Sequence, residues 1–487
     1  MGKSKKAIVG YKYFIGMHAV FCHGPIDKLL KIVVGDRDAW SGSSSGGQIN
    51  VNAPGLFGGE KREGGVSGKV DFEPGDADQQ KNSYLSSKAG GRVSANRGVS
   101  GVVLRQCYIG NNPYIKPWHY LVQRIHRTRR TGETQWYDAK AQIGQDMNPA
   151  HIIRECLTDI EWGMGYNAGD IGNSFQSAAD TLYSENFGMS LLWDRAITIE
   201  EFLNEVIQTI DGSLYVDITT GKFELSLARD DYDPDNLPVL DESNIISVQQ
   251  VKRKSSAELV NSVTLKFWNQ NTYATDSVQV HDIALIGMMG SQVGTTITYD
   301  GITDPALASV VATRELRALS RKLASVTLVT TRAISGLQIG GVFAFTWPRL
   351  GIERMILRVI EIEYGNLTDG SIKIKTVEDI FSTPAPMTAA SEPTECASPN
   401  TMPVPVPHQY MYEATYYDII TEFGDEYVKQ LDKDSSAAMI VADAPSDDSY
   451  GATVHSKITG EYEEADTITF APYAELDGAI GYQNTSI

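Results

Sequence analysis

Four acidic residues have the spacing of ligands in a calcium-binding loop. Asp231, Asp233, Asp235 and Glu242 reproduce positions 1, 3, 5 and 12 of such a loop, whose carboxylate oxygens would bind the ion. Asn236, however, stands where that loop needs a glycine, and a strand pattern precedes the motif where a helix is expected. We therefore favour a polar surface turn, keep a metal site as the alternative, and expect no cofactor.

Carboxylates that could form the acid pair of a glycoside hydrolase lie in the middle of the chain; they are Glu161, Glu185, Glu200 and Glu201. Glu201 is expected to cap a helix, and isolated acids in an acidic chain are usually solvated. The sequence contains no nucleophile elbow, HExxH motif, Walker A motif or deaminase zinc signature. His23 and His151 are interpreted as packed or hydrogen-bonded side chains. We expect no catalytic residue and no enzymatic activity.

Three arginines form a basic stripe on a predicted helix that opens at Asp304 and Pro305. Arg314, Arg317 and Arg321 recur at spacings of three and four, opposite a row of leucines. A solvated or salt-bridged face is the favoured interpretation. A subunit contact or the lining of a DNA channel is the alternative, so these arginines are the interaction candidates.

The bulk composition narrows the classes of protein. The 61 acidic and 42 basic residues give a formal charge of -19, which disfavours general binding to nucleic acid or anionic lipid. The four cysteines are far apart, without a CxxC pair, so their spacing supports neither a zinc site nor a disulfide framework. No signal peptide or membrane span is evident, and we expect synthesis in a reducing cytoplasm.

The best-defined local element is a helix followed by a hairpin. Thr198 and Glu201 form a capping box, and apolar residues follow at helical spacing up to Ile210, before Asp211 and Gly212 end the run. Alternating residues at 214–218 and 223–227 flank a turn, which predicts a β-hairpin. An earlier helix is predicted to begin at Pro149, since proline suits a first helical turn.

At 487 residues the chain is expected to contain several domains, of a β-rich α+β class. We predict a first β-barrel domain over 1–148, with a glycine-rich loop or arm at 41–101. An α+β domain over 149–240 and a second β-barrel domain with one helix over 241–382 follow, with strands resuming at Val326, Val342, Ile356 and Ile372. Seven prolines indicate a linker at 383–407, and 408–487 is expected to be a small C-terminal β domain.

Several stretches, taken in order, resemble the tail-tip (baseplate) hub and host-specificity proteins of siphophages, including the lambda-like group. They lie between residues 10 and 382 and comprise 16–26 (GMHAVFCHGPI), 56–65 (LFGGEKREGG), 148–158 (NPAHIIRECLT), 162–165 (WGMG), 223–232 (FELSLARDDY), 314–320 (RELRALS) and 377–381 (VEDIF). No single stretch is diagnostic; their order along one chain carries the resemblance.

The resemblance implies a homotrimer in which two barrel-like domains per chain form a pseudo-sixfold ring that continues the tail tube. It implies contacts with the distal tail protein, the tape-measure protein C-terminus and other tail-tip or fibre proteins, with the host surface reached indirectly. Such a hub would close the tube in the virion and open during genome ejection, with DNA passing transiently and without specific binding. The chain carries no evident central fibre, so direct receptor contact is not implied. A tail-associated cell-wall hydrolase and a host-glycan-binding adhesin remain the alternatives.

Overall fold

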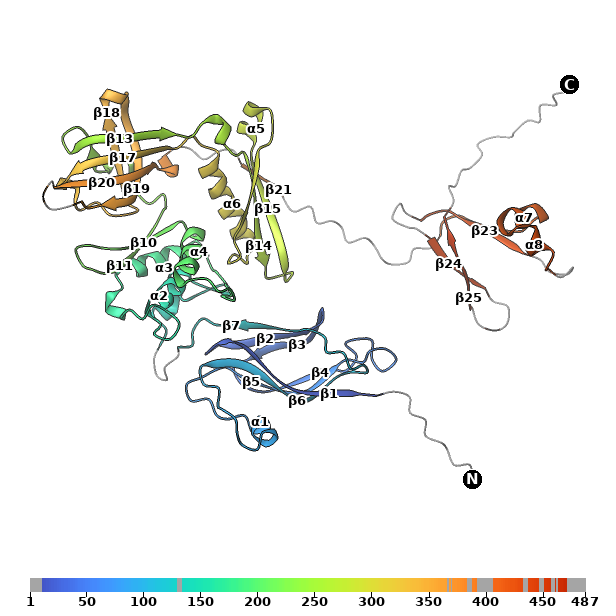
Figure 1. Ribbon diagram of the computed structural model, residues 1–487. Coiled ribbons are helices and arrows are strands. Elements are labelled where there is room, and N and C mark those ends of the chain that lie inside the picture. The colour runs from blue at the N-terminus through green and yellow to red at the C-terminus, as the bar shows by residue number, and fades with distance from the viewer. Residues whose placement is uncertain are drawn as a thin grey trace, which may run out of the picture. The chain divides into compact units, whose positions relative to one another are not determined.

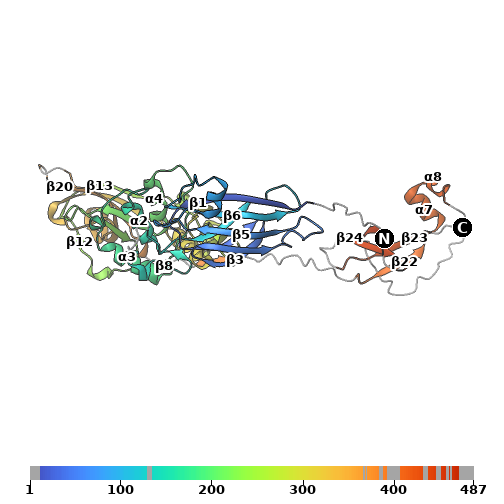
Figure 2. The same ribbon diagram turned by 90° about the horizontal axis from the view of Figure 1, so that it is seen from below.

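The structure is a computed structural model that describes residues 11–128, 134–365, 368, 370–382, 388–391, 406–431, 437–445, 451–456, 460 and 463–470. The chain divides into two compact units, residues 1–393 and 394–487, each of which is described by itself. Figures 1 and 2 show that strands predominate in the first unit and that helices gather in its middle part. The β-rich, multidomain character predicted from the sequence is confirmed.

The first β domain packs two antiparallel sheets face to face. One has the order β1-β6-β5-β4, from β1 (Tyr13–His23), β6 (Val99–Gly110), β5 (Val66–Glu73) and β4 (Gly47–Ala53). The other has the order β3-β2-β7, from β3 (Arg37–Ser44), β2 (Lys28–Val34) and β7 (Trp118–Gln123). Leu29 and Ile32 of one sheet share a buried core with Val70 and Leu104 of the other. This core explains the alternating apolar pattern of the N-terminal sequence.

The prediction of one long loop or arm at residues 41–101 is wrong. β4 and β5 lie within this range as regular strands, and α1 (Ser83–Lys88) adds a short helix. Their alternating apolar residues face the core, and Val51 and Phe72 are buried. Gly68 sits in β5 at a positive φ of +147°, where a Cβ would approach Cys107 Sγ to 2.8 Å. The glycines therefore serve strand irregularities and turns as well as loops.

The helical region contains three amphipathic helices, α2 (Pro149–Thr158), α3 (Ser174–Ser184) and α4 (Ile199–Thr209). The capping box of Thr198 and Glu201 is confirmed, as is Pro149 in the first turn of α2. The predicted hairpin is also confirmed, with β10 (Gly212–Val216) antiparallel to β11 (Phe223–Leu227). A small hairpin of β8 (Gln142–Ile143) and β9 (Asp146–Met147) precedes α2.

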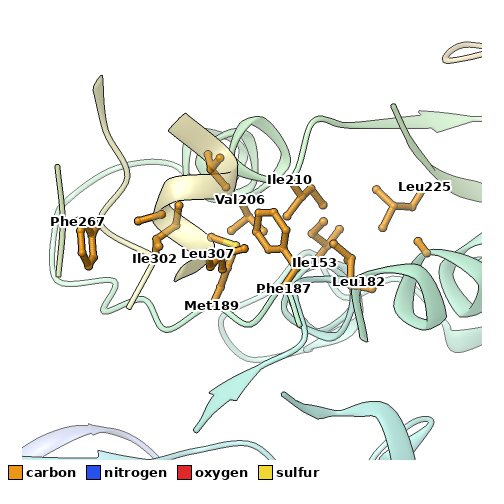
Figure 3. Close-up of a cluster of buried hydrophobic side chains, with 14 of the residues drawn as sticks. Ile153, Leu182, Phe187, Met189, Val206, Ile210, Leu225, Phe267, Ile302 and Leu307 are labelled. Atoms are coloured by element: carbon orange, nitrogen blue, oxygen red, sulfur yellow. The ribbon is translucent and has the colours of Figure 1, made fainter. Parts of the chain in front are cut away.

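A four-stranded sheet shares the buried core of this helical region. Its order is β16-β14-β15-β21, from β16 (Gly294–Thr298), β14 (Ser262–Asn269), β15 (Ala274–Asp282) and β21 (Thr388–Ser391). The predicted helix after Pro305 is α6 (Pro305–Leu319), which packs on β14 and β15, and α5 (Ile283–Met289) follows β15. Figure 3 shows the shared core, where Val206 and Ile153 lie in one cluster with Leu307 and Phe267.

The six-stranded sheet has the order β12-β18-β19-β20-β17-β13. Its strands are β12 (Val239–Leu240), β13 (Ile245–Arg253), β17 (Ala324–Thr331), β18 (Val342–Trp347), β19 (Ile352–Glu363) and β20 (Ser371–Glu378). Phe343, Phe345, Leu357 and Ile374 are fully buried in its core. Val326, Val342, Ile356 and Ile372 each lie in a strand, as predicted.

These two sheets show that residues 241–382 contribute to two cores. Residues 262–319 leave the six-stranded sheet after β13 and pack with α2–α4, and the chain then returns at β17. The division at 240 and 241 therefore remains a prediction about domains, while the core of the helical region spans it. Of the predicted linker at 383–407, residues 383–387 and 392–405 lie outside the described residues, and 388–391 form β21 against β15.

The C-terminal unit, in the part that the structure describes, contains two strand pairs and two helices. β22 (Gln409–Glu413) pairs with β23 (Ala438–Ala442), and β24 (Gly451–Ser456) pairs with β25 (Glu463–Thr469). The helices are α7 (Tyr416–Phe423) and α8 (Asp425–Val428). Among the described residues of the whole chain, no helix is long and apolar enough to cross a membrane.

Candidate functional sites

The four residues of the calcium-like motif lie on the surface before and after β12. The Asp233 carboxylate accepts a hydrogen bond from the Asp235 backbone N–H at 3.0 Å and so caps the short turn Pro234–Asn236. Glu242 lies 2.9 Å from Arg349 Nε. Within the described ranges, no group of three or more His, Cys, Asp or Glu side chains is arranged to hold a metal ion. The motif residues are used in a turn and an ion pair.

The structure places the hydrolase candidates on separate elements. Glu185 forms a paired contact with Arg229, with Nε to Oε1 at 2.6 Å and Nη2 to Oε2 at 2.9 Å. Glu201 accepts the Thr198 backbone N–H at 3.0 Å in the capping box. Glu200 lies in the first turn of α4, and Glu161 lies in the loop after α2. Glu185 and Glu201 therefore have structural contacts within the chain.

Arg314 and Arg317 lie on α6, whereas Arg321 follows the end of the helix at Leu319, so the prediction that all three share one helical face is wrong for Arg321. Arg314 Nε lies 2.6 Å from the Asp211 carboxylate, and its Nη2 donates to the Thr209 carbonyl at 2.7 Å. Arg317 stacks over the Phe381 ring at 5.1 Å from the centroid. Burial is the main cause that lowers the pKa of Arg321, and the nearby charge of Arg317 adds to it. Arg314 thus fastens α6 to the end of α4, where an ion pair can hold two helices in register.

A second polar cluster connects the segment after β11 to the six-stranded sheet. Arg358 and Asp379 are almost fully buried, with Nε to Oδ1 at 2.8 Å. Arg358 also donates to the carbonyls of Gly340 and Arg229, at 2.8 and 3.0 Å, and Tyr232 donates its hydroxyl hydrogen to Asp379. Burial raises the pKa of Tyr232, and its bond to Asp379 adds to the shift. Every charge here is matched, as burial of an ion pair requires.

A cavity of about 420 Å³ opens between the end of β7, α2 and the segment 189–193. Trp193 stacks on Phe202 at 5.0 Å and meets Trp162 edge to face at 6.0 Å, and all three rings line the cavity. Arg124 reaches the Glu155 carboxylate across the cavity lining, with Nη1 to Oε2 at 3.1 Å. The cavity has the size and lining of a site for an apolar group, with one neutralised charge pair.

The Cys22 thiol lines this cavity, and its environment does not favour a reactive thiolate. Burial raises the pKa of the Cys22 thiol, which keeps it protonated and a poor nucleophile. His23 also lines the cavity. The contact between Arg124 and Glu155 joins residues 31 positions apart, so no local sequence pattern pointed to it.

His151, which was interpreted as a packed residue, is buried in α2. Its ring lies 4.7 Å from the Trp136 ring, and Nε2 is 3.3 Å from the Tyr137 carbonyl oxygen. Burial lowers the pKa of His151 to about 4, so the imidazole is neutral near pH 7. A structural role therefore accounts for this histidine.

Part of this chain matches the model of one known protein family. Residues 198–362 match the model of a family described as putative phage tail protein. This range begins at the N-cap of α4 and ends within β19, so it includes the hairpin, α6 and most of the six-stranded sheet. A search of curated proteins finds no significant match.

Three solved structures are similar at low identity. A chain of the virion of a native gene transfer agent particle is 15% identical, with a TM-score of 0.46, and the match covers 77% of this chain and 80% of that one. A tail protein from Neisseria meningitidis MC58 is 9% identical, with a TM-score of 0.33 and coverage of 74% and 99%. The 43 kDa tail protein of prophage MuSo2 from Shewanella oneidensis is 10% identical, with a TM-score of 0.28 and coverage of 74% and 100%. At TM-scores below 0.5 these likenesses carry no conclusion, and the family match over residues 198–362 is what makes this chain similar to phage tail proteins.

Proposed function

We propose that this chain is the structural tail-tip hub of a long-tailed bacteriophage. Three copies would form a ring that continues the tail tube, closes it in the virion and opens for genome ejection. The observation that carries the proposal is the family match, because residues 198–362 span the α4-to-β19 region that links the helical core to the six-stranded sheet. The ordered stretches that resemble siphophage hub proteins extend the likeness toward the N-terminus.

The proposed role is mechanical and not enzymatic. Two arginine-centred clusters, around Arg314 and Arg358, tie the helical region to α6 and to the six-stranded sheet. Breaking a buried ion pair costs several kcal/mol, so the pair of Arg358 and Asp379 keeps the parts it joins together when copies move relative to one another. Opening of the ring would then change the packing between copies. The partners would be the distal tail protein, the tape-measure protein C-terminus and further tip or fibre proteins, in a virion assembled in the bacterial cytoplasm.

The integrity of α4 offers a test of this role. Ile207→Pro removes a helical hydrogen bond and costs about 3 kcal/mol or more, whereas Ile207→Ala keeps the helix. In phage carrying each variant, we expect the proline substitution to stop tail-tip assembly and the alanine substitution to permit it. Assembly is scored by electron microscopy of lysates, with antibody detection of the soluble chain. Normal infectious particles that contain the proline variant would overturn the proposal.

A cell-wall hydrolase is the main rival, and it predicts activity on peptidoglycan that one carboxylate substitution abolishes. Glu161→Gln and Glu200→Gln are suitable variants, because both carboxylates lie outside the ion pair of Glu185 and the capping box of Glu201. A glycan-binding adhesin instead predicts saturable binding to host surface polysaccharide. We expect neither activity from the purified chain.

A further inference from the structure

One edge of the six-stranded sheet is basic and uncovered. β13 is a terminal strand that pairs only with β17, and Lys252, Arg253 and Lys254 follow one another, exposed, at its end. The strand register puts Arg253 opposite Ala324, which brings Arg321 and Lys322 to the same end of the sheet. We call Lys252, Arg253 and Lys254 the basic end of β13.

The three consecutive cations are not neutralised within the chain. Among the described residues, Lys252, Arg253 and Lys254 take part in no salt bridge, whereas Lys373 and Lys375 of the same sheet reach Glu363 and Glu361 at 3.0 and 2.8 Å. The sheet thus pairs its other exposed lysines internally. The basic end of β13 is left with charge to offer a partner.

The opposite terminal strand of the sheet is preceded by carboxylates. Asp230, Asp231, Asp233 and Asp235 are exposed, and they stand a few residues before β12; we call them the acidic run. The backbone of the run is fixed to the sheet, since Tyr232 bonds to Asp379 and Arg354 donates to the Pro234 carbonyl. The backbone that carries these carboxylates is therefore held against the sheet.

Apolar side chains accompany both charged groups. Val251, which directly precedes Lys252 on β13, is 38% exposed, and Val239 on β12 is 49% exposed. Apolar residues next to charged ones make up the usual anatomy of a protein interface. Each edge therefore has apolar area to bury as well as a charge to match.

The two charged groups do not meet within one chain. A four-residue turn joins β12 to β13, but Lys252 lies seven residues beyond Ile245, about 23 Å along an extended strand. In the described part of the chain, no salt bridge connects the acidic run to the basic end. Complementary patches at different places on one chain suit a heterologous contact, which generates a ring when the rotation closes.

We propose that the basic end of β13 binds the acidic run of a second copy of this chain, so that copies join head to tail into a closed ring. The inference rests on the proposed function, which needs several copies around the tail axis. Duplex DNA is the less favoured occupant, because the net charge of -19 opposes its approach and the chain itself supplies a fixed row of carboxylates.

Charge reversal on the full chain tests the contact. The first variant carries Lys252→Glu, Arg253→Glu and Lys254→Glu, and the second carries Asp230→Lys, Asp231→Lys and Asp235→Lys, which spares the turn cap at Asp233. A third variant combines all six substitutions. A control carries Lys69→Glu, Lys81→Glu and Lys222→Glu, which are exposed positions elsewhere. Assembly is measured by light scattering across concentration at low and physiological salt.

We expect each single-sided reversal to raise the concentration for half-dissociation at least about 100-fold, because like charges then face each other. In the variant that combines all six substitutions, the concentration for half-dissociation should return to within about 10-fold of that of the unsubstituted chain. In the control, this concentration should not change. Unchanged assembly of the first variant, or equal loss in the first and the combined variants, would overturn the contact while leaving the tail-tip role intact.

Three further outcomes would each contradict part of the proposal. If the first variant assembles normally but loses retention on duplex DNA, the basic end binds nucleic acid and the proposed contact is wrong. If the unsubstituted chain is monomeric at every concentration, the contact and the oligomeric part of the proposed function fail together. An assembly that behaves as expected but is absent from phage particles would overturn the proposed function alone.

Discussion

The first β domain and the six-stranded sheet both bury an apolar core, but they treat their charges differently. In the first domain, Arg105 reaches Asp71 at 2.6 Å, and Lys31 reaches Asp38 at 2.9 Å, so these two partly buried cations are matched within the domain. The six-stranded sheet buries the pair of Arg358 and Asp379 and leaves three cations on an edge strand unmatched. The difference lies in burial: the ion pair of the six-stranded sheet is almost fully buried, whereas the Asp38 side chain in the first domain is more than half exposed.

Breaking the buried pair should have the largest effect on stability. Asp379→Ala leaves the Arg358 guanidinium buried without its carboxylate, which costs about 3–5 kcal/mol. The matched change in the first domain, Asp38→Ala, removes an exposed partner and should cost at most about 1 kcal/mol. Urea unfolding of both variants checks the contrast. Equal losses would show that the two regions do not differ in this way.

A buried histidine in the helical region is expected to make the stability of the protein depend on pH. The pKa of His151 is lowered from 6.5 to about 4 by burial, so the folded state binds this proton less readily than the unfolded chain. Stability is therefore full above pH 6.5 and falls as the pH drops toward 4, by about 3 kcal/mol in all.

Unfolding measured between pH 7 and pH 4 tests this, with His151→Phe as the comparison. The variant should lose the His151 component of the pH slope, while other titrating groups keep theirs. An identical slope in both proteins would contradict the assignment.

A smaller effect is expected from a backbone position in the first β domain. Gly68→Ala places a Cβ 2.8 Å from Cys107 Sγ at a φ of +147°, which should cost about 1–3 kcal/mol. Gly47→Ala is the control, since its φ is also positive but no atom lies within 4 Å of the added carbon. Thermal unfolding should rank Gly68→Ala clearly below the control. The reverse order would argue against close packing between β5 and β6.

The smallest effect is expected at the most exposed pair. Lys12 and Glu60 lie 2.5 Å apart, with both side chains more than half exposed, so Lys12→Ala should leave the free energy of unfolding almost unchanged. Salt should weaken even this contribution. A clear loss of stability in chemical unfolding would mean that exposed pairs in the first domain do more than match charge.

Local chemistry made part of this fold predictable. The capping box of Thr198 and Glu201, the proline at position 149 and the 212–227 hairpin follow from residues within one or two turns of each other. The strands within 41–101 were missed because glycine was taken as a sign of loop, while Gly68 serves a strand irregularity. The core that β14 and α6 share with the earlier helices could not be predicted from local patterns, because these elements lie far apart in the sequence.

The candidate sites were less predictable than the elements. The spacing of Arg314, Arg317 and Arg321 predicted a face of a helix, but only tertiary structure shows that Arg314 turns inward to Asp211. The run of Lys252, Arg253 and Lys254 is visible in the sequence as a charge block. Its meaning depends on β13 being a terminal strand, which a single sequence does not reveal.

The position of the chain in the virion tests the central claim most directly. Antibody raised against the purified chain is applied to phage particles and viewed by negative-stain electron microscopy, with pre-absorbed antibody as the control. The tail-tip hub predicts label confined to the tail end away from the capsid, on most particles. Label along the tail, on the capsid, or nowhere on particles that are shown to be intact would contradict the account.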